Sequence, residues 1–378
     1  MATGKELERV RKLLDNITDH YSVGCLENCV FLSTAESIHY FTGFRCHEGS
    51  VFALIPFWGE QKPVVVTDAR YKDKASREMD LGSFDLLIAE SVDYITTLFE
   101  HFKQNRYEMP RSIFFEGGYE NEGLRVKQKN ILKDVFRISC FKDVTNEILK
   151  TRSIKDEEEV TLTKKAISIS ETALDIVLNF VRPGVRESEI AGMISFEHKK
   201  QGADGDSFEP IVASGINSSF PHGGENRVIQ FGDIVQFDIG CSYKGYCSDI
   251  SRAFVVRERP GGDQFKLCSI VKEIQEKIIS KIKPGVDLFK VNQWYGQLVR
   301  DKGYRMAHSF GHGVGLQVHE YPTIASQSSC IAEPGQIITV EPGIYIKDEF
   351  GVRIEDMVLV TENGLEVLTS LERILAVV

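Results

Sequence analysis

Gly232-Asp-Ile-Val-Gln-Phe-Asp-Ile-Gly-Cys-Ser-Tyr-Lys-Gly-Tyr-Cys-Ser-Asp-Ile-Ser251 is the stretch that decides the fold of this chain, because it places Asp238 and Asp249 eleven residues apart. Two apolar, strand-like runs and a turn-like pair accompany the aspartates: Ile234–Phe237, Ile250–Val256 and Lys244-Gly245. Apolar runs joined by a short connection that contains glycine predict a β-hairpin, which would bring the aspartates side by side in mid-sheet. Aspartate is depleted in strands, and two buried carboxylates repel each other unless a cation or a shared proton relieves them. Either aspartate alone is more often a turn residue, whereas the pair indicates a functional site.

The sequence after residue 150 repeats one unit. Arg182-Pro-Gly-Val185 and Lys283-Pro-Gly-Val286 are each followed by a helical stretch, and in both copies a second glycine, Gly202 or Gly303, follows the motif's own glycine by 18 residues. In each copy a further glycine then precedes an acidic residue by six positions, and a second acidic residue follows across a turn. These residues are Gly232, Asp238 and Asp249 in the first copy and Gly335, Glu341 and Glu355 in the second. A duplicated helix-plus-hairpin unit is therefore predicted, and two facing copies would pool four carboxylates.

A fifth candidate ligand lies in the run His308-Ser-Phe-Gly-His-Gly-Val-Gly-Leu-Gln-Val-His-Glu320, whose glycines allow the backbone to pass close to a neighbour. Three of the nine histidines, His308, His312 and His319, fall within these residues, and His222 precedes the first acidic hairpin. One histidine on an apolar strand is more often a core residue than a ligand. The clustering favours a metal site or a proton-transfer site.

Four carboxylates and one imidazole form an oxygen-rich donor set without thiolate, which suits Mn²⁺, Co²⁺, Zn²⁺ or Mg²⁺. The carboxylates carry about four negative charges together, so two divalent cations are needed to neutralise them. Two cations roughly 3.5 to 4 Å apart can share a water and lower its pKa toward about 7. The chemistry predicted from the residues is metal-assisted hydrolysis.

Composition limits the kinds of partner and compartment. The chain has 378 residues, enough for two to three domains, and 45 Lys and Arg against 55 Asp and Glu give a net charge of −10. This charge argues against a broad basic surface for nucleic acid. The charged start Met1–Arg9 has no apolar signal core, no stretch is long enough for a membrane span, and the eight cysteines show no CxxC spacing. We therefore expect a cytoplasmic protein with reduced thiols that binds neither nucleic acid nor membrane.

The first part of the chain, 1–150, alternates helical and strand-like segments, as an α/β domain does. The predicted helices are 5–17 and 94–103, and the predicted strands are 30–32, 51–57, 64–66 and 112–115. The aromatic-rich segments Ile38–Phe44 and Asp68–Tyr71 are interpreted as strand edges and core packing. Lys150–Glu159 is predicted to be an exposed linker into a helix, with Ser153 and the acidic residues 156–159 at the helix start.

At five positions and their surrounding motifs, the sequence from about 150 to 370 resembles the pita-bread metallopeptidases, the family of methionine aminopeptidase, aminopeptidase P and prolidase, with creatinase as a relative. The motifs are Asp-Ile-Gly, Ser-Asp-Ile-Ser-Arg, Gly-His-Gly-Val-Gly, Val-Glu-Pro-Gly and Arg-Ile-Glu-Asp, and the positions are Asp238, Asp249, His312, Glu341 and Glu355. Tyr40-Phe-Thr-Gly-Phe44 and Thr67-Asp-Ala-Arg-Tyr71 are similar to the creatinase-type N-terminal domain of the Xaa-Pro branch. The resemblance implies an α/β creatinase-like N-terminal domain, 1–150, followed by an α+β pita-bread catalytic domain, 151–378, with an internal pseudo-twofold repeat.

The resemblance also implies the ligand set of two divalent metal ions, with Mn²⁺ as the first choice and Co²⁺ or Zn²⁺ as alternatives. Asp249 and Glu355 would bridge both ions, and Asp238 would bind one of them. His312 and Glu341 would complete the other. Glu341 would in addition carry the proton from the nucleophile to the leaving nitrogen, which makes it a catalytic residue.

The substrate-binding residues implied by the resemblance are His222, His308, His319 and Arg353. His222 and His319 would contact the scissile region and are the other two catalytic candidates. His308 and Arg353 would shape the pocket around proline, although Arg353 is as well explained by a salt bridge between strands. Some relatives carry a tyrosine whose hydroxyl braces a metal ligand at the position of Phe208, so this brace is expected to be absent.

We therefore predict a prolidase-like hydrolase that cleaves the peptide bond before proline in Xaa-Pro dipeptides and forms a homodimer. The loop Arg45-Cys-His-Glu48 carries charges that could cap a short peptide, and a solvated loop explains them equally well. An Xaa-Pro aminopeptidase that acts on longer peptides is the alternative enzyme. A non-catalytic, peptidase-like binding module is the alternative of another class, and the complete ligand set argues against it. Creatinase-like hydrolysis of a small guanidino compound is a third alternative. An enzyme of that kind would not be expected to retain all five metal ligands.

Overall fold

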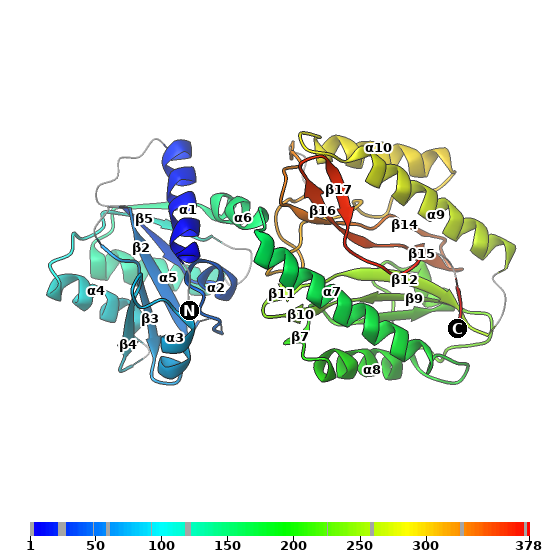
Figure 1. The fold of residues 1–378 in the computed structure, drawn as a ribbon, viewed down its shortest axis with the longest axis horizontal. Helices are drawn as coiled ribbons and strands as arrows, with labels where there is room; N and C mark the ends of the chain where they lie inside the picture. Colours follow the sequence, from blue (N-terminus) through cyan, green and yellow to red (C-terminus); the bar gives the residue numbers. More distant parts are fainter. Residues whose placement is uncertain are drawn as a thin grey trace. The chain divides into compact units, whose positions relative to one another are not determined.

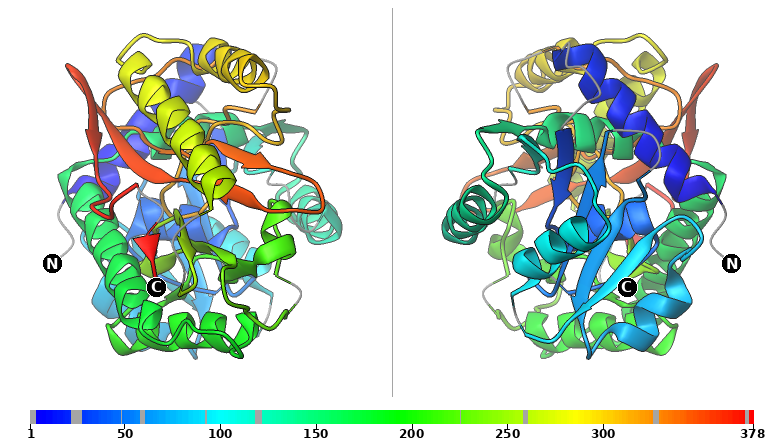
Figure 2. Two further views of the ribbon diagram at one scale, coloured as in Figure 1. Left: turned by 90° about the vertical axis from the view of Figure 1, so that its right-hand side faces the viewer. Right: turned by 90° about the vertical axis from the view of Figure 1, so that its left-hand side faces the viewer.

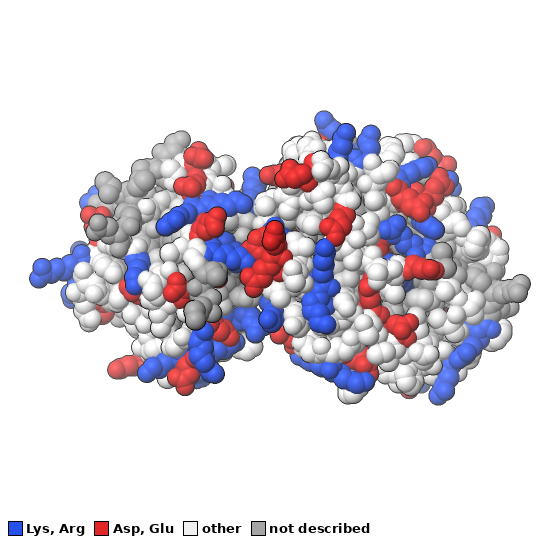
Figure 3. Space-filling model, viewed as in Figure 1, with Lys and Arg blue, Asp and Glu red and all other residues white. Residues whose placement is uncertain are grey.

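The computed structural model describes residues 4–378 except 22–27, 48, 58–60, 92, 118–121, 225, 258–260, 326–328 and 374–375. The chain divides into two compact units, Met1–Arg152 and Ser153–Val378, drawn in Figure 1. Within the described residues, no helix combines the length and the apolar content that a bilayer span requires. On the face drawn in Figure 3, acidic and basic side chains are interspersed.

Unit 1 is built on a six-stranded mixed sheet. Its strands are β1 (Asn28–Leu32), β2 (Val51–Pro56), β3 (Val64–Asp68), β4 (Asp85–Ala89), β5 (Ser112–Phe115) and β6 (Cys140–Asp143). They lie in the order β4-β3-β2-β1-β5-β6. The pairs β1/β2 and β2/β3 are antiparallel, and the other three pairs are parallel. The predicted strands of this half are therefore confirmed to within a few residues.

The helices of unit 1 cover this sheet. They are α1 (Lys5–Tyr21), α2 (Ala35–Thr42), α3 (Lys72–Glu78), α4 (Tyr94–Gln104), α5 (Glu122–Phe136) and α6 (Thr145–Ser153). Apolar side chains of α4 and α5 pack on one face of the sheet, and Figure 1 labels these two helices beside the strands. The strand-edge interpretation of residues 38–42 was wrong, because they belong to α2. Thr34 caps this helix by accepting from the Ser37 N–H, and Gly43 ends it with a φ of 76°.

Unit 2 contains the predicted repeat. Its helices are α7 (Glu157–Leu178), α8 (Glu187–Lys200), α9 (Gly262–Lys281) and α10 (Leu288–Asp301). They form two pairs, α7–α8 in green and α9–α10 in yellow, with the strands of the unit between them (Figures 1 and 2). The glycines of the repeat have equivalent backbone conformations, with φ of 91° at Gly202 and 85° at Gly303.

The strands of unit 2 form several small sheets. The first copy holds β7 (Gly205–Asp206), β8 (Ile211–Ser214), β9 (Ile234–Ile239), β10 (Cys241–Tyr243), β11 (Tyr246–Cys247) and β12 (Ile250–Val255), with the short helix η1 (Gly215–Ser219). The second copy holds β13 (Ile337–Val340), β14 (Gly343–Tyr345), β15 (Gly351–Arg353), β16 (Asp356–Thr361) and β17 (Gly364–Val367). The C-terminal strand β18 (Ala376–Val377) returns to pair with β12.

The deciding stretch forms the predicted antiparallel pair, since β9 pairs with β12 and Asp238 lies opposite Ser251. Lys244 and Gly245, with φ of 50° and 89°, form the turn between β10 and β11. This φ sign at both positions is typical of the two-residue hairpin turn. The prediction that both aspartates lie in mid-sheet holds for Asp238, which is within β9, and was wrong for Asp249, which lies one residue before β12. The other two acids, Glu341 and Glu355, also lie one residue outside a strand end.

The segment predicted to be an exposed linker is structured. Ile154 forms a β-bridge with Gln336, and the ammonium of Lys155 donates to Glu320 Oε1 at 2.6 Å with side-chain exposures of 1% and 2%. The predicted helix start is confirmed for the acidic residues, because Asp156 and Glu159 form a capping box at the first turn of α7. It was wrong for Ser153, which is the last residue of α6.

Lys155→Met is expected to lower the free energy of unfolding of unit 2 by about 3 to 5 kcal/mol, because it leaves the carboxylate of Glu320 buried without this cation. Lys164→Met is the matched control, since the Lys164–Glu366 pair is 45% and 47% exposed and its loss should change stability by less than about 1 kcal/mol. Urea unfolding of the two variants makes the comparison. Equal destabilisation by both would contradict the assigned role of the buried pair.

Candidate metal centre

The candidate ligands come together where the two copies of the repeat meet. Asp238 lies in β9, and Asp249 precedes β12. The segment that carries His312 runs along β13, because Thr339 N–H donates to His312 O at 2.8 Å. This approach requires glycine at position 311, where a Cβ atom would lie 2.0 Å from Thr339 O.

Asp249, His312 and Glu355 each offer a ligand atom, and these three atoms lie within 4.8 Å of one another. The Nε2 atom of His312 lies 3.5 Å from Asp249 Oδ2 and 3.4 Å from Glu341 Oε1. His312 Nδ1 is 3.2 Å from Gly313 O, and a proton on Nδ1 satisfies that carbonyl. The lone pair on Nε2 then faces the carboxylates, which is the orientation a metal-binding histidine needs.

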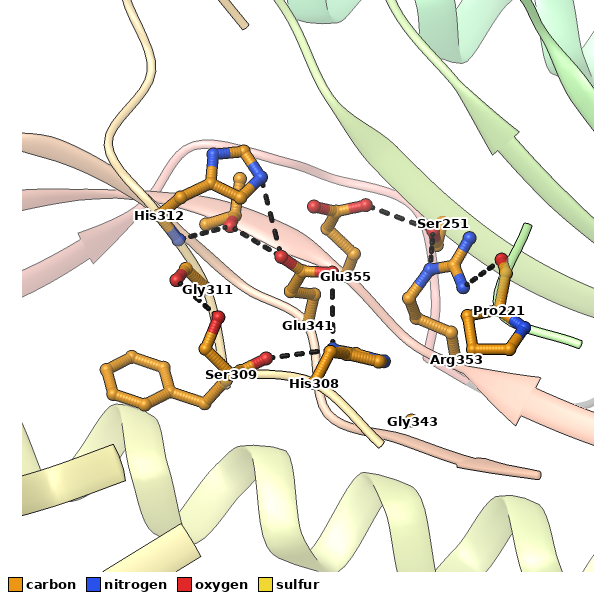
Figure 4. Close-up of polar contacts among 12 residues, drawn as sticks. Pro221, Ser251, His308, Ser309, Gly311, His312, Glu341, Gly343, Arg353 and Glu355 are labelled. Carbon is orange, nitrogen blue, oxygen red and sulfur yellow. Dashed lines mark hydrogen bonds and ion pairs between the residues drawn. The ribbon is translucent and has the colours of Figure 1, made fainter. Parts of the chain in front are cut away.

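The remaining carboxylate, Asp238, is held by two side chains from the strands around it. Ser251 Oγ lies 2.9 Å from Asp238 Oδ1 and 3.0 Å from Glu355 Oε2. Arg353 donates from Nη2 to Asp238 Oδ2 at 2.6 Å and from Nε to Ser251 Oγ at 2.8 Å. Ser251 therefore joins an acid of the first copy to an acid of the second, and Figure 4 shows its contact with Glu355.

A second arginine ties the copies together behind these ligands. Arg252 donates from Nη1 to Ser251 O at 2.9 Å and to Glu355 O at 2.6 Å. Its Nη2 donates to Asp356 Oδ1 at 2.7 Å, and these two side chains are 2% and 1% exposed. The backbones at Ser251 and Glu355 are thus held by one buried guanidinium.

Burial and mutual repulsion act on the two innermost carboxyls. Burial raises the pKa of Asp249 well above its usual value, and the charges of Asp238 and Glu341 raise it further. Burial likewise raises the pKa of Glu355 well above its usual value, and Asp249 adds to this effect. A nearby cation favours the charged form of a carboxyl and so relieves this cost. The donor atoms, their spacing and their electrostatics fit divalent cations.

The structure places His308 and Arg353 beside this cluster and joins them through Tyr345, which the sequence analysis did not identify. His308 Nε2 lies 3.0 Å from the Tyr345 hydroxyl, and Arg353 Nη1 donates to that hydroxyl at 2.6 Å. His308 Nδ1 is 3.8 Å from Glu341 Oε2, and Figure 4 shows Glu341 between His308 and His312. Burial raises the pKa of Tyr345 to about 12, so its hydroxyl keeps its proton at neutral pH.

His222 and His319 are both exposed. The ring of His319 lies edge-on to that of His312, with centroids 4.3 Å apart. Partial burial and then the neighbouring His312 lower the pKa of His319 to about 4, with a smaller contribution from His222 in the same direction. Both histidines therefore lie on the exposed side of the cluster.

Phe208, expected to lack a bracing hydroxyl, lies against the end of β9. Its Cε1 atom would be 2.9 Å from a Cβ atom at Gly240. Both oxygens of Asp238 already have side-chain partners in Ser251 and Arg353. The structure therefore braces this candidate ligand from β12 and β15.

Family models match both units. Residues 161–362 match the metallopeptidase family M24, and residues 9–154 match the creatinase/prolidase N-terminal domain. The chain is a member of metallopeptidase family M24, with a creatinase/prolidase N-terminal domain ahead of the catalytic one.

Particular relatives cover nearly the whole chain. An uncharacterised peptidase of Bacillus subtilis, YqhT, is 33% identical over 349 residues, 90% of this chain and 93% of its own. An Xaa-Pro dipeptidase from Bacillus anthracis is 32% identical with a TM-score of 0.87, covering 99% of this chain and 100% of that one. An X-Pro aminopeptidase from Thermotoga maritima is 33% identical with a TM-score of 0.82, covering 93% and 97%. The predicted class and the pita-bread fold with its α/β N-terminal domain are confirmed.

Asp249→Asn is expected to lower the bound divalent metal and to abolish peptidase activity, because the substitution removes a charge at the centre of the ligand set. Metal analysis of the purified variant after dialysis measures the first effect. Asp175→Asn, on the exposed surface of α7, is the matched control and should bind metal as the unmodified chain does. Unchanged metal content in the Asp249 variant would rule out its place among the ligands.

Proposed function

We propose that this chain is a dinuclear metal-dependent Xaa-Pro dipeptidase, which hydrolyses the peptide bond before proline. The observation that carries the proposal is the buried group of Asp249, His312 and Glu355, with Glu341 beside His312. The solved dipeptidase from Bacillus anthracis, similar over the full chain, supports the substrate class. The proposed domains are the creatinase-like 1–150 and the catalytic 151–378.

The proposed ligands of two divalent cations, with Mn²⁺ first, are Asp238, Asp249, His312, Glu341 and Glu355. Such cations lower the pKa of water and polarise the scissile carbonyl. Four of these five residues are acids, so the set prefers hard cations over sulfur-loving ones. Ser251 and Arg353 keep the oxygens of Asp238 and Glu355 oriented.

Glu341 is the proposed proton carrier. Its oxygens lie 3.4 Å from His312 Nε2 and 3.8 Å from His308 Nδ1, and the side chain is only half-buried. It is therefore reachable both from the ligand cluster and from the substrate side. The nitrogen of proline carries no hydrogen in the scissile bond, so it must receive a proton to leave as an amine, and a carboxyl in this position can deliver it.

The proposed substrate contacts divide into two pairs. His222 and His319, on the exposed side of the cluster, would contact the scissile region. His308 would form part of the wall around proline. Arg353 is 3% exposed, and its guanidinium is engaged by Asp238, Ser251, Tyr345 and Pro221 O. Arg353 would thus shape the pocket through the groups that it holds.

Length selection needs a group that meets the far end of the peptide, and Arg45 of unit 1 is the candidate. Its backbone is fixed, because its N–H donates to Glu78 Oε2 at 3.0 Å and its carbonyl accepts from Lys74 Nζ at 2.6 Å. Glu48 of the same loop lies outside the described residues. A homodimer and a cytoplasmic location complete the proposal. The seven cysteines of the described part are free, which suits a reducing compartment.

The second candidate is an Xaa-Pro aminopeptidase that acts on longer peptides, favoured by the similarity to the X-Pro aminopeptidase from Thermotoga maritima. Rates on Xaa-Pro dipeptides and on matched Xaa-Pro-Yaa tripeptides separate the two. A dipeptidase is expected to have the higher kcat/KM on the dipeptides. Faster cleavage of the tripeptides would select the second candidate, and cleavage of neither by the metal-loaded protein would favour a binding module.

Glu341→Gln is expected to lower kcat by roughly 10² to 10⁴-fold, the usual size of general acid–base assistance. The variant should keep the fold, because Glu341 lies at a strand end and is half-buried. Assays with excess Mn²⁺ separate the loss of metal from the loss of proton transfer. Full recovery of activity under excess Mn²⁺ would exclude the proton-carrying role.

A further inference from the structure

The segment that carries His222 runs from Ser214, at the end of β8, through η1 to Arg227. Both of its ends are held by one carboxylate, Glu187, the first residue of α8. Ser214 donates to Glu187 Oε1 from its backbone N–H at 2.5 Å and from its hydroxyl at 2.8 Å. Arg227 N–H donates to Glu187 Oε2 at 2.8 Å. The side-chain amide of Asn217 lies 3.2 Å from Oε1 and 3.0 Å from Oε2.

Glu187 is 2% exposed, and a carboxylate is rarely buried this deeply without a specific reason. All four of its partner groups are donors, so both oxygens act as acceptors. Its position at the start of α8 is also favourable for a negative charge, because the helix dipole is positive there. The carboxylate is therefore stable in this place and fixes the two ends of the segment relative to each other.

The middle of the same segment is held from the second copy of the repeat. Gly351 N–H donates to Ser218 Oγ at 3.1 Å, and Arg353 Nη1 donates to Pro221 O at 3.0 Å. Gly223, the residue after His222, packs closely against η1, because a Cβ atom at this position would lie 1.9 Å from Asn217 O. His222 thus lies between fixed backbone positions although its own side chain is exposed.

The second copy anchors the far end of its histidine segment in a similar way. Asp287, at the start of α10, accepts from Ser329 Oγ at 3.0 Å and from Cys330 N–H at 3.2 Å. Leu288 N–H donates to Cys330 O at 2.7 Å, as Glu187 N–H donates to Arg227 O at 3.0 Å. The segment ending at Cys330 carries His319. In both copies, the start of the second helix holds the far end of a segment with an exposed histidine.

We propose that Glu187 is a positioning residue for substrate, which sets the place of His222 by clamping Ser214 to Arg227. Among the described residues, the side chain of Glu187 bonds to Ser214, Asn217 and Arg227 and to none of the proposed metal ligands. It acts through the backbone of the segment. This inference rests on the proposed function, because it takes His222 to contact the substrate. Misplacing a contact group by about 1 Å can lower a rate by 10²-fold.

The test uses the full-length, metal-loaded protein and Xaa-Pro dipeptides. Glu187→Gln puts an amide donor against partners that are themselves donors, so one hydrogen bond of the clamp is replaced by a repulsive contact. We expect kcat/KM to fall about 10- to 100-fold with bound metal unchanged. Glu189→Gln is the matched control: Glu189 is exposed on the same turn and accepts one hydrogen bond from Arg186 N–H at 3.1 Å, which glutamine can also accept. The control should keep its activity.

A double-mutant cycle distinguishes positioning from general damage. In a His222→Ala background, Glu187→Gln should lower kcat/KM no further, because its effect passes through His222. An equal fold-loss with and without His222, or a loss of metal, would overturn the proposal. Should Glu187→Gln fold poorly, Glu187→Asp enters the same cycle, since it keeps both acceptor oxygens on a shorter side chain and is expected to show the same dependence on His222.

Hydrogen exchange separates the failure of this inference from the failure of the proposed function. The amides of Ser214 and Arg227 donate to different oxygens of Glu187, so at least one of them should exchange faster in Glu187→Gln than in Glu189→Gln, whatever the substrate is. Unchanged exchange at both amides would refute the clamp. If exchange increases while His222→Ala is fully active, the clamp exists but the positioning role for substrate is overturned along with the proposed role of His222.

Discussion

The repulsion among buried carboxylates is the constraint on which the rest of this structure depends. Asp249 and Glu355 lie within reach of the same imidazole, and burial raises the pKa of both. Holding like charges together requires fixed donors around them, and Ser251 and Arg353 provide these donors at Asp238 and Glu355. The neighbouring strands and turns can be understood as the frame that keeps these groups in place.

The duplication explains how such a frame is built from ordinary elements. Each copy contributes one acid at a strand and one acid just before the next strand, so neither copy alone gathers the set. The copies are joined at the site itself: Glu355 N–H donates to Ser251 O at 3.1 Å, and Arg252 binds the carbonyls of both residues. The site is therefore a property of the interface between the copies.

Much of this was predictable because the signals were local. The turn at Lys244-Gly245, the capping box at Asp156 and the spacing of the acids each depend on residues close in sequence. The buried ion pair that was missed depends on distant residues. Lys155 and Glu320 are 165 positions apart. The charged run 150–159 was predicted to be exposed because nothing near it in the sequence indicates that Glu320 pairs with Lys155. Residues 38–42 were read as a strand edge because their aromatic content outweighed the helix signals of Thr34 and Gly43. Tyr345 lies only eight positions from Arg353, but it belongs to no motif that sets it apart in the sequence.

Arg353 has a thermodynamic consequence that extends beyond geometry. One guanidinium binds a proposed metal ligand, Asp238, and the carbonyl next to His222, that of Pro221. Burial alone would lower the pKa of Arg353, but the charge of Asp238 raises it. The guanidinium therefore stays cationic and interacts with both Asp238 and the Pro221 carbonyl. Two sites that share a partner are linked, and linkage is reciprocal. Cation binding at the acidic cluster that favours an ordered His222 segment by a given free energy is therefore favoured by the same free energy when a peptide orders that segment.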